Sequence, residues 1–402
     1  MNVQATYVRT DEGKVEVVLR FTKNRDDDPE VWYILPRRAW DTVTCPSLRG
    51  ELNSVVSEPF ATIEEAQEWE RKQLNEIKEK ITAYRMSKRH RWISGTLYEE
   101  ETRNMMDTVV RVTVYATDKA SADKAAAAAF ARIQKVADAA SIFDKKAEAF
   151  RLNRDGHLDN PSAELIELTR LSLEYNRITN GYFDITVQPL LDLWSAGLWK
   201  EKPEVQQSRV AETMKLIGSD NIELSASRIS LPVKGMKLTF GAIAKGYAVE
   251  EALNTLKAEG IKHATVTAGG EIGSLGTKPD GQPWTIALVN PDNAKQSLAT
   301  FQWLAEKSIS TSGNYERYFS ADKKVNHLVN PKTGYSIPDC TSVTIIASTN
   351  TRTDALATAI FAMGPEAGMN LVKSLKDVEC LMVDGNNQII TSRGIDKYLS
   401  QS

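Results

Sequence analysis

The chain has 402 residues, a length typical of two domains, and its composition is that of a soluble globular protein. Its 50 basic and 53 acidic residues give a formal net charge of −3, so no overall charge attracts nucleic acid or an anionic membrane. No stretch approaches the roughly 18 apolar residues of a membrane span, and the three cysteines lack the spacing of metal ligands. We therefore predict a protein with reduced thiols, no membrane span and no nucleic-acid partner.

The N-terminal part has the pattern of a small α+β module. Residues 15–19 and 31–35 are strand-like, with apolar and β-branched side chains. Thr62 and Glu65 have the spacing of a capping box and predict the start of a long charged helix.

The basic stretch at residues 85–92 follows this helix and is interpreted as a linker. A nucleic-acid role for it finds no support elsewhere in the chain. We therefore predict a small module of unknown role over residues 1–95, which includes the basic linker, and a larger domain over residues 96–402.

The larger domain is predicted to be α+β. Helices are expected over residues 121–140, after Asn160 and Pro161, over 246–257 and over 352–362, and strands over 109–115, 263–267, 284–289, 301–304, 343–347 and 378–383.

Asp354 and Thr358 are the strongest metal-ligand candidates. They are four residues apart on the last predicted helix, so their oxygens point from one face. Mg²⁺ takes one or two protein oxygens and fills its other positions with phosphates and water. The alternative is a structural pair, with an acidic residue in the first turn and a threonine that bonds to the backbone.

Residues 241–246 place small side chains before a predicted helix, where backbone N–H groups can approach an anion. Lys245 adds a movable positive charge. Small residues at such a junction are also packing devices, so this pattern leaves both interpretations open. The chain has neither a P-loop nor a Gly-x-Gly-x-x-Gly fingerprint, which disfavours conventional NTPases and dinucleotide dehydrogenases.

Three further polar clusters lie in the last third of the chain. Residues 269–271 and 311–313 are predicted to be turns with glycines and hydroxyls. His327 is one of four histidines, and near Asn330 and Lys332 it is a candidate phosphate donor or general base. A purely structural histidine is the alternative.

Together these residues resemble the FAD:protein FMN transferases, the ApbE-type family, from about Met105 to the C-terminus. The matching segments keep their order and are residues 105–110, 143–153, 181–190, 241–248, 269–271, 283–284, 311–319, 327–334 and 354–358. The resemblance implies a two-layer α+β core with mixed sheets. It also implies a Mg²⁺-dependent enzyme that takes FAD as substrate, transfers FMN to a Ser or Thr hydroxyl of an acceptor flavoprotein and releases AMP.

The resemblance also implies roles for individual residues. His327 matches the base for the incoming hydroxyl, and Lys245 a catalytic cation that also contacts the flavin substrate. The implied metal site consists of Ala242, through its carbonyl, with Asp354 and Thr358. The implied substrate-binding positions are Met106, Phe143, Tyr182, Phe183, Asp184, Thr239, Gly269, Gly270, Glu271, Thr311, Ser312 and Val329.

The sequence departs from the family pattern in three places. Thr239 stands where the family usually has Asp, which predicts a weaker or rearranged flavin or adenine contact. Asn330 replaces the commoner Asp before Pro331. Residues 1–95 have no counterpart in the family core, and no secretory leader is recognised, which predicts a cytoplasmic protein with a cytosolic acceptor.

Two alternative functions stay open at this point. A FAD pyrophosphatase would use the same site with water in place of the acceptor hydroxyl. A non-catalytic flavin-binding protein would bind FAD without releasing AMP. Self-flavinylation is not predicted, because the chain lacks an acceptor-type Asp-x-x-Ser/Thr-Gly-Ala-Ser/Thr segment.

Overall fold

The structure is a computed structural model, and it describes residues 2–9, 15–22, 54–56, 60–72, 88–93, 95–290, 296–303 and 307–400. The chain divides into two compact units, residues 1–87 and 88–402. The strand predicted at 31–35 lies outside the described residues, as does any continuation of the first helix beyond residue 72.

The first unit contains a three-stranded antiparallel sheet and a helix. The strands β1 (Asn2–Arg9), β2 (Val15–Thr22) and β3 (Ser54–Val56) lie in that order. Residues 63–72 are helical. The predicted capping box is confirmed: the Glu65 N–H donates to Thr62 Oγ1 at 3.2 Å, and the Thr62 N–H donates to Glu65 Oε2 at 3.3 Å.

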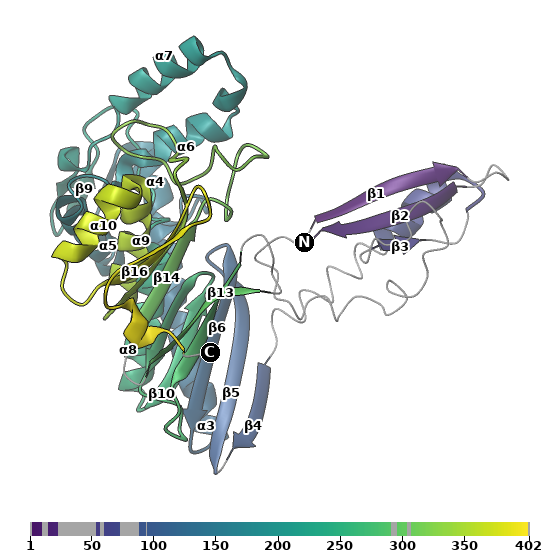
Figure 1. Cartoon of the computed structure of the whole chain (residues 1–402), viewed down its shortest axis with the longest axis vertical. Coiled ribbons are helices and arrows are strands. Elements are labelled where there is room, and N and C mark those ends of the chain that lie inside the picture. The colour runs from purple at the N-terminus through teal and green to yellow at the C-terminus, as the bar shows by residue number, and fades with distance from the viewer. Residues whose placement is uncertain are drawn as a thin grey trace. The chain divides into compact units, whose positions relative to one another are not determined.

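The second unit is built on a nine-stranded sheet with the order β17-β16-β15-β14-β11-β10-β6-β5-β4 (Figure 1). The strands are β4 (Lys88–Ile93), β5 (Thr96–Met105), β6 (Thr108–Ala116), β10 (His263–Ala268), β11 (Glu271–Leu275), β14 (Ser308–Gly313), β15 (Cys340–Ala347), β16 (Glu379–Asp384) and β17 (Ile389–Thr391). Neighbouring strands pair antiparallel throughout the described part of this sheet, although mixed sheets were expected.

Helices cover one face of this sheet and a hairpin covers the other. The helices are α3 (Lys119–Ala140), α4 (Glu148–Asp155), α5 (Ala163–Ile178), α6 (Gln188–Ser195), α7 (Pro203–Met214), α8 (Ala244–Ala258), α9 (Asn350–Met363) and α10 (Pro365–Ser374). Of these, α3, α8, α9 and α10 contact strands of the sheet directly. The hairpin consists of β12 (Trp284–Val289) and β13 (Ser297–Trp303). A small sheet of β7 (His157–Asp159), β9 (Arg228–Ser230) and β8 (Glu223–Leu224) completes the unit, so the predicted α+β class is confirmed.

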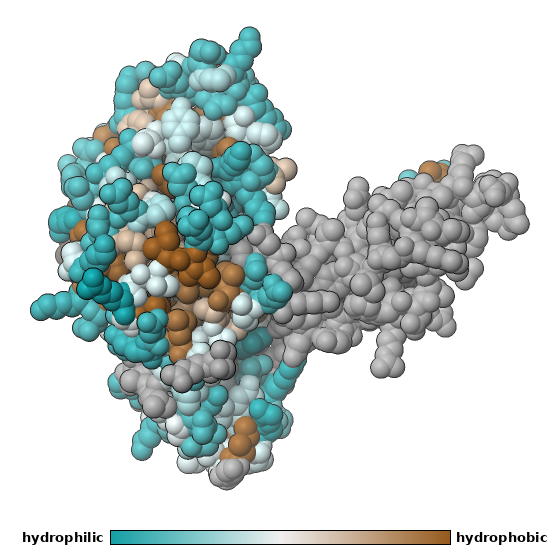
Figure 2. Space-filling view, viewed as in Figure 1, coloured by the Kyte–Doolittle hydropathy of each residue, from teal (hydrophilic) through white to brown (hydrophobic). Residues whose placement is uncertain are grey.

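The alternation of side chains along β6 produces the two cores. Val112 and Val114 are buried in the core that the helices share with the sheet. Tyr115 points to the opposite face, where its ring centroid lies 6.2 Å from that of Trp284 in the hairpin. A second, smaller core forms there around Phe301 and Trp303. Hydrophobic residues also gather near the middle of the face seen in Figure 2, surrounded by hydrophilic surface.

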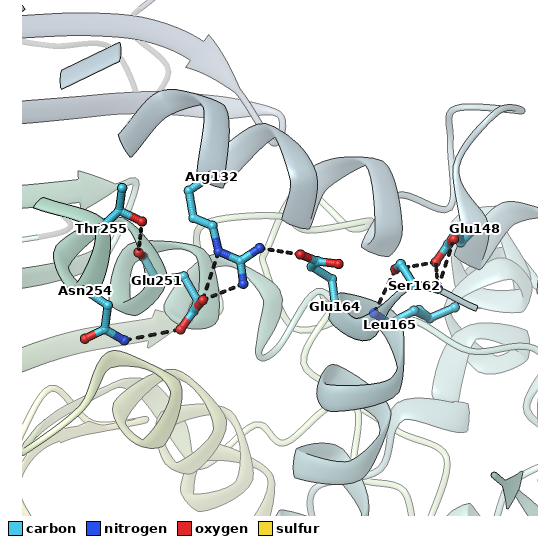
Figure 3. A network of polar contacts seen from close by, with 8 residues as sticks. All are labelled: Arg132, Glu148, Ser162, Glu164, Leu165, Glu251, Asn254 and Thr255. Atoms are coloured by element: carbon cyan, nitrogen blue, oxygen red, sulfur yellow. Dashed lines mark hydrogen bonds and ion pairs between the residues drawn. The ribbon is translucent and has the colours of Figure 1, made fainter. Parts of the chain in front are cut away.

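Arg132 ties three helices together (Figure 3). This α3 residue donates through Nη1 to Glu164 Oε1 of α5 at 2.5 Å and through Nε to Glu251 Oε2 of α8 at 2.9 Å. The two acceptors flank the guanidinium, which is partly shielded from solvent. The network fixes α8, whose first turn carries Lys245, against the helical layer.

The linker predicted at residues 85–92 is wrong for residues 88–92, which belong to edge strand β4. In the register of β4 and β5, Arg89 lies opposite Glu100 and His90 lies opposite Glu99. Opposite charges across neighbouring strands stabilise their pairing. The basic run is therefore half of a charged hairpin, which its own composition does not reveal.

The start of α5 also differs from the prediction. The capping residue is Ser162, whose Oγ accepts the Leu165 N–H at 3.2 Å, and not Asn160 or Pro161. Across the described segments, no helix combines the length and the apolar character needed to cross a bilayer.

Candidate functional site

The candidate site lies where α8 and α9 approach each other most closely. The Gly246 N–H donates to Asp354 Oδ2 at 2.8 Å. A Cβ at Gly246 would lie 2.4 Å from the Asn350 carbonyl oxygen and 2.6 Å from Asp354 Cβ, closer than atoms can pack. A glycine is therefore required at this point of α8.

Two buried carboxylates face one ammonium beside this contact. Lys245 Nζ lies 2.7 Å from Glu271 Oε2, and both Glu271 and Asp354 are buried. Burial, followed by repulsion from Glu271, raises the pKa of Asp354 to about 7, while Lys245 and the Gly246 N–H oppose the shift. Burial alone would lower the pKa of Lys245, but Glu271 and Asp354 outweigh it and hold that pKa above its usual range. When both carboxylates are ionised, the cluster carries one more negative charge than positive.

A divalent cation fits this excess charge. Asp354 offers a carboxylate, and one turn later Thr358 offers a hydroxyl whose Oγ1 lies 3.2 Å from Ser312 Oγ. No group of three or more His, Cys, Asp or Glu side chains that could hold a metal occurs among the described residues. One carboxylate with neutral oxygens, completed by ligand phosphates and water, suits Mg²⁺ rather than a metal held wholly by the protein. Ala242 is half-buried just before α8, and its metal contact stays a prediction.

Serines on alternate positions of β14 hold α9 to the sheet. Side chains two apart on a strand share a face, so these three hydroxyls all point to the helix. The pairs are Ser308 Oγ with Asn350 Oδ1 at 2.8 Å, Ser310 Oγ with Thr353 Oγ1 at 2.7 Å and Ser312 Oγ with Thr358 Oγ1 at 3.2 Å.

The turn predicted at residues 311–313 is wrong, because these residues end strand β14 between β11 and β15. Thr311 points away from α9, and its Oγ1 lies 2.9 Å from Thr344 Oγ1 on β15. Thr311 and Ser312 therefore lie on opposite faces of the sheet. Only Ser312 joins the cluster beside Asp354.

The turn predicted at residues 269–271 is confirmed for Gly269 and Gly270, which connect β10 to β11, and is wrong for Glu271, which begins strand β11. Gly269 has φ of +67°, and a Cβ there would lie 2.9 Å from Thr108 Oγ1. The hairpin places Glu271 at the first position of β11, opposite Ser310 of β14.

His327 lies in the long connection between β14 and β15. Its Nδ1 is 2.8 Å from the Arg317 carbonyl oxygen, which also accepts the His327 backbone N–H at 3.0 Å. A carbonyl can only accept, so Nδ1 carries the proton and Nε2 of the neutral ring is an acceptor. Burial lowers the pKa of His327 to about 4, and the positive charges of Arg317 and Lys245 lower it further. The hydrogen bond to the Arg317 carbonyl raises this pKa but does not outweigh the other effects. The ring is neutral at pH 7.

The turn that carries Met106 is tied to the His327 segment. Met106 and Asp107 connect β5 to β6 with φ of +53° and +59°. Asp107 Oδ2 lies 3.0 Å from Arg317 Nη2, and the Arg317 carbonyl orients His327. The structure thus links the segments of Met106 and His327 through one arginine.

Three predicted flavin-contacting residues sit together after α5 but differ in environment. The Tyr182 ring lies 4.6 Å from Lys332 Nζ. Phe183 is only 1 % exposed and packs in the core. The Asp184 carboxylate accepts the Thr186 N–H and the Ser219 hydroxyl, both at 2.8 Å. The structure gives Phe183 and Asp184 supporting contacts, and their contact with flavin stays a prediction.

The remaining predicted residues are spread over the larger unit. Phe143 is 75 % exposed just beyond α3, and Val329 is buried in a separate cluster with Leu190 and Trp194. Thr239 Oγ1 accepts the Gly241 N–H at 3.3 Å, and residues 236–240 form no strand before α8. The predicted residues that the structure brings into one cluster are Lys245, Glu271, Ser312, Asp354 and Thr358.

Sequence reasoning missed Arg317 and the serines at 308 and 310. The serines alternate from 308 to 312, with Ile309 between the first two, and this pattern could have predicted a strand with one polar face. Arg317 acts on His327 through its backbone carbonyl, which no sequence pattern marks.

Comparisons with known proteins show the family and the fold of the larger unit. The model of the ApbE family matches residues 106–382. The chain is similar to the FAD:protein FMN transferase of Vibrio cholerae, with 28% identity over 278 residues, 67% of this chain and 80% of that protein. The Haemophilus influenzae protein of the same name is 28% identical over 263 residues, 62% of this chain and 76% of its own length.

Two solved structures share the fold. The ApbE protein of Thermotoga maritima has a TM-score of 0.67 and 27% identity, covering 76% of this chain and 100% of its own. The flavinyl transferase ApbE of Pseudomonas stutzeri has a TM-score of 0.65 and 25% identity, covering 76% of this chain and 98% of its own.

We predict that Gly246→Ala destabilises the protein by about 2 kcal/mol, the range of overpacked cores. The new methyl group meets a backbone oxygen and Asp354 Cβ, so α8 and α9 must separate, which outweighs the better helix propensity of alanine. Thermal unfolding measures the effect. Gly241→Ala is the matched control, because its Cβ would meet only Thr239 Oγ1 at 3.5 Å. Equal melting temperatures for the two variants would show that the close approach is not required.

Proposed function

The chain belongs to the ApbE family and is a flavin-transferring enzyme, and we propose that it transfers FMN from FAD to a Ser or Thr hydroxyl of an acceptor flavoprotein and releases AMP. The observation that carries this proposal is the buried cluster of Lys245, Glu271 and Asp354. It lies inside the segment that matches the family model and suits a cation with a phosphorylated ligand.

Asp354 and Thr358 would hold Mg²⁺ in this reaction. When bound, the ion offsets negative charge on the FAD pyrophosphate. Lys245 supplies a second positive charge, and its side chain is more exposed than that of its partner Glu271. These residues would bind the pyrophosphate and stabilise charge that develops on the departing AMP.

His327 would accept the proton of the acceptor hydroxyl. The Arg317 carbonyl holds Nδ1, which leaves Nε2 to act as the base. The hydroxyl oxygen forms a bond to the phosphorus of the FMN half, the bond from that phosphorus to the bridging oxygen breaks, and its electron pair leaves with AMP. The proton removed from the hydroxyl resides on Nε2.

We further propose that residues 88–402 carry the activity and that the smaller unit acts elsewhere, because every residue assigned a role lies in the larger unit. We also place the reaction in the cytoplasm. The buried free thiols of Cys340 and Cys380 support a reducing compartment.

The test of the function is incubation with FAD, Mg²⁺ and candidate flavoproteins, followed by mass spectrometry of the acceptor and chromatography of the nucleotides. We expect AMP and covalently bound FMN to appear in equal amounts. AMP with an equal amount of free FMN would identify a pyrophosphatase instead. FAD binding without AMP would identify a non-catalytic flavin-binding protein.

We predict that Asp354→Asn lowers AMP release on the order of 100-fold, because a neutral amide replaces the anionic ligand in nearly the same volume. Thr358→Val should cost less, since it removes a neutral ligand. Steady-state rates at several Mg²⁺ concentrations measure both effects, with circular dichroism to check folding. Parental turnover of Asp354→Asn would remove Asp354 from the metal site.

We predict that His327→Ala lowers single-turnover FMN transfer by about 100-fold or more, while the Kd for FAD changes little. Only the neutral ring accepts a proton, so the rate should fall as the pH drops through about 4, the pKa of His327. At saturating Mg²⁺ this residue should cause no inflection at its ordinary value of 6.5. Weaker FAD binding with an unchanged transfer rate would exclude His327 as the base.

A further inference from the structure

We propose that Glu271 is a positioning residue that orients Lys245 toward the phosphate group and keeps its ammonium away from Asp354, without contacting the flavin itself. This inference rests on the proposed function. Glu271 was predicted from the sequence as a substrate-binding residue, and its position in the structure supports a different role.

Lys245 and Glu271 differ in their exposure to solvent. In the pair of Lys245 with Glu271, whose charged atoms are 2.7 Å apart, the lysine side chain is 27% exposed and the glutamate side chain 4%. The lysine is therefore the member of the pair whose side chain a ligand from solvent can reach. Nζ has three donors, and Glu271 Oε2 accepts one of them, so others are available to phosphate oxygens.

Glu271 lies on a backbone that its neighbouring strands hold in place. Glu271 lies opposite Ala268 of β10 on one side and opposite Ser310 of β14 on the other, so strands flank its backbone on both sides. The turn at Gly269 and Gly270 has little room for change, because a Cβ at Gly270 would lie 2.9 Å from the Thr311 carbonyl oxygen. A carboxylate on such a backbone can fix the position of a flexible lysine side chain.

Asp354 is the alternative partner for Lys245. Lys245 directly precedes Gly246, whose N–H donates to Asp354 Oδ2 at 2.8 Å, so this carboxylate lies close to the lysine. After Glu271, Asp354 also exerts the largest attraction on the ammonium. If Glu271 lost its charge, Lys245 would turn toward the Asp354 carboxylate. An ion pair there would occupy the oxygens that the cation needs, so Glu271 preserves both the cationic group and the metal ligand.

A double-mutant cycle tests the inference through turnover. We expect Glu271→Gln to lower kcat about 10-fold with a small change in KM, and Lys245→Met to lower it further. Because Glu271 acts through Lys245, the double variant should equal Lys245→Met. Losses that multiply in the double variant, or an unchanged kcat for Glu271→Gln, would overturn the proposal.

Binding of Mn²⁺, followed by electron paramagnetic resonance of the free ion, gives a readout that does not require turnover. Glu271→Gln should weaken Mn²⁺ binding about 10-fold, the scale of outer-shell effects on metal sites. The double variant with Lys245→Met should recover it, since no ammonium remains to pair with Asp354. If Glu271 were itself a ligand, the double variant would stay weak, and the inference would be wrong.

Glu379→Gln is the matched control. Glu379 lies on β16, outside the cluster, and its Oε1 is 3.2 Å from Lys397 Nζ. Glu379→Gln therefore also removes the carboxylate partner of a lysine. This variant should lose thermal stability but keep kcat and Mn²⁺ affinity. Equal effects of Glu379→Gln and Glu271→Gln would indicate a structural role for both. If the parent protein transferred no FMN, the proposed function would fail, while Mn²⁺ binding would still decide the role of Glu271.

Discussion

The site depends on the contact between the first turn of α8 and the second turn of α9. The absence of a side chain at Gly246 lets the two helices approach until a backbone N–H reaches the Asp354 carboxylate. The same turn of α8 carries Lys245, so one close approach places both a cationic and an anionic group. The Arg132 network and the β14 serines hold the two helices in this arrangement.

The charges beside this contact indicate which kind of ligand the site could bind. Two buried carboxylates beside one ammonium are costly, because burial penalises each charge and the carboxylates repel each other. A core can contain two such carboxylates if a cation balances their charge when substrate is bound. The raised pKa of Asp354 and the exposed side of Lys245 both reflect a site prepared for a charged ligand.

His327 belongs to a second structural element, the connection between β14 and β15. Its ring is oriented by a backbone carbonyl, while the ion pair of Arg317 with Asp107 ties this connection to the β5–β6 turn. The proposed base and the cluster of Lys245, Glu271 and Asp354 are therefore positioned by separate parts of the fold. The low pKa keeps the ring neutral at pH 7, since burial and positive neighbours disfavour its protonation.

The sequence by itself determined the α+β class, the capping box at Thr62, the turn at Gly269 and the pairing of Asp354 with Thr358 on one helix, because each depends on local spacing. It misplaced residues 88–92 and 311–313, since pairing with distant strands overrides local composition. Only the tertiary structure decided which candidates meet: Glu271 reaches Lys245, whereas Phe183 enters the core. Those outcomes depend on contacts between segments far apart in the chain, which no local pattern encodes.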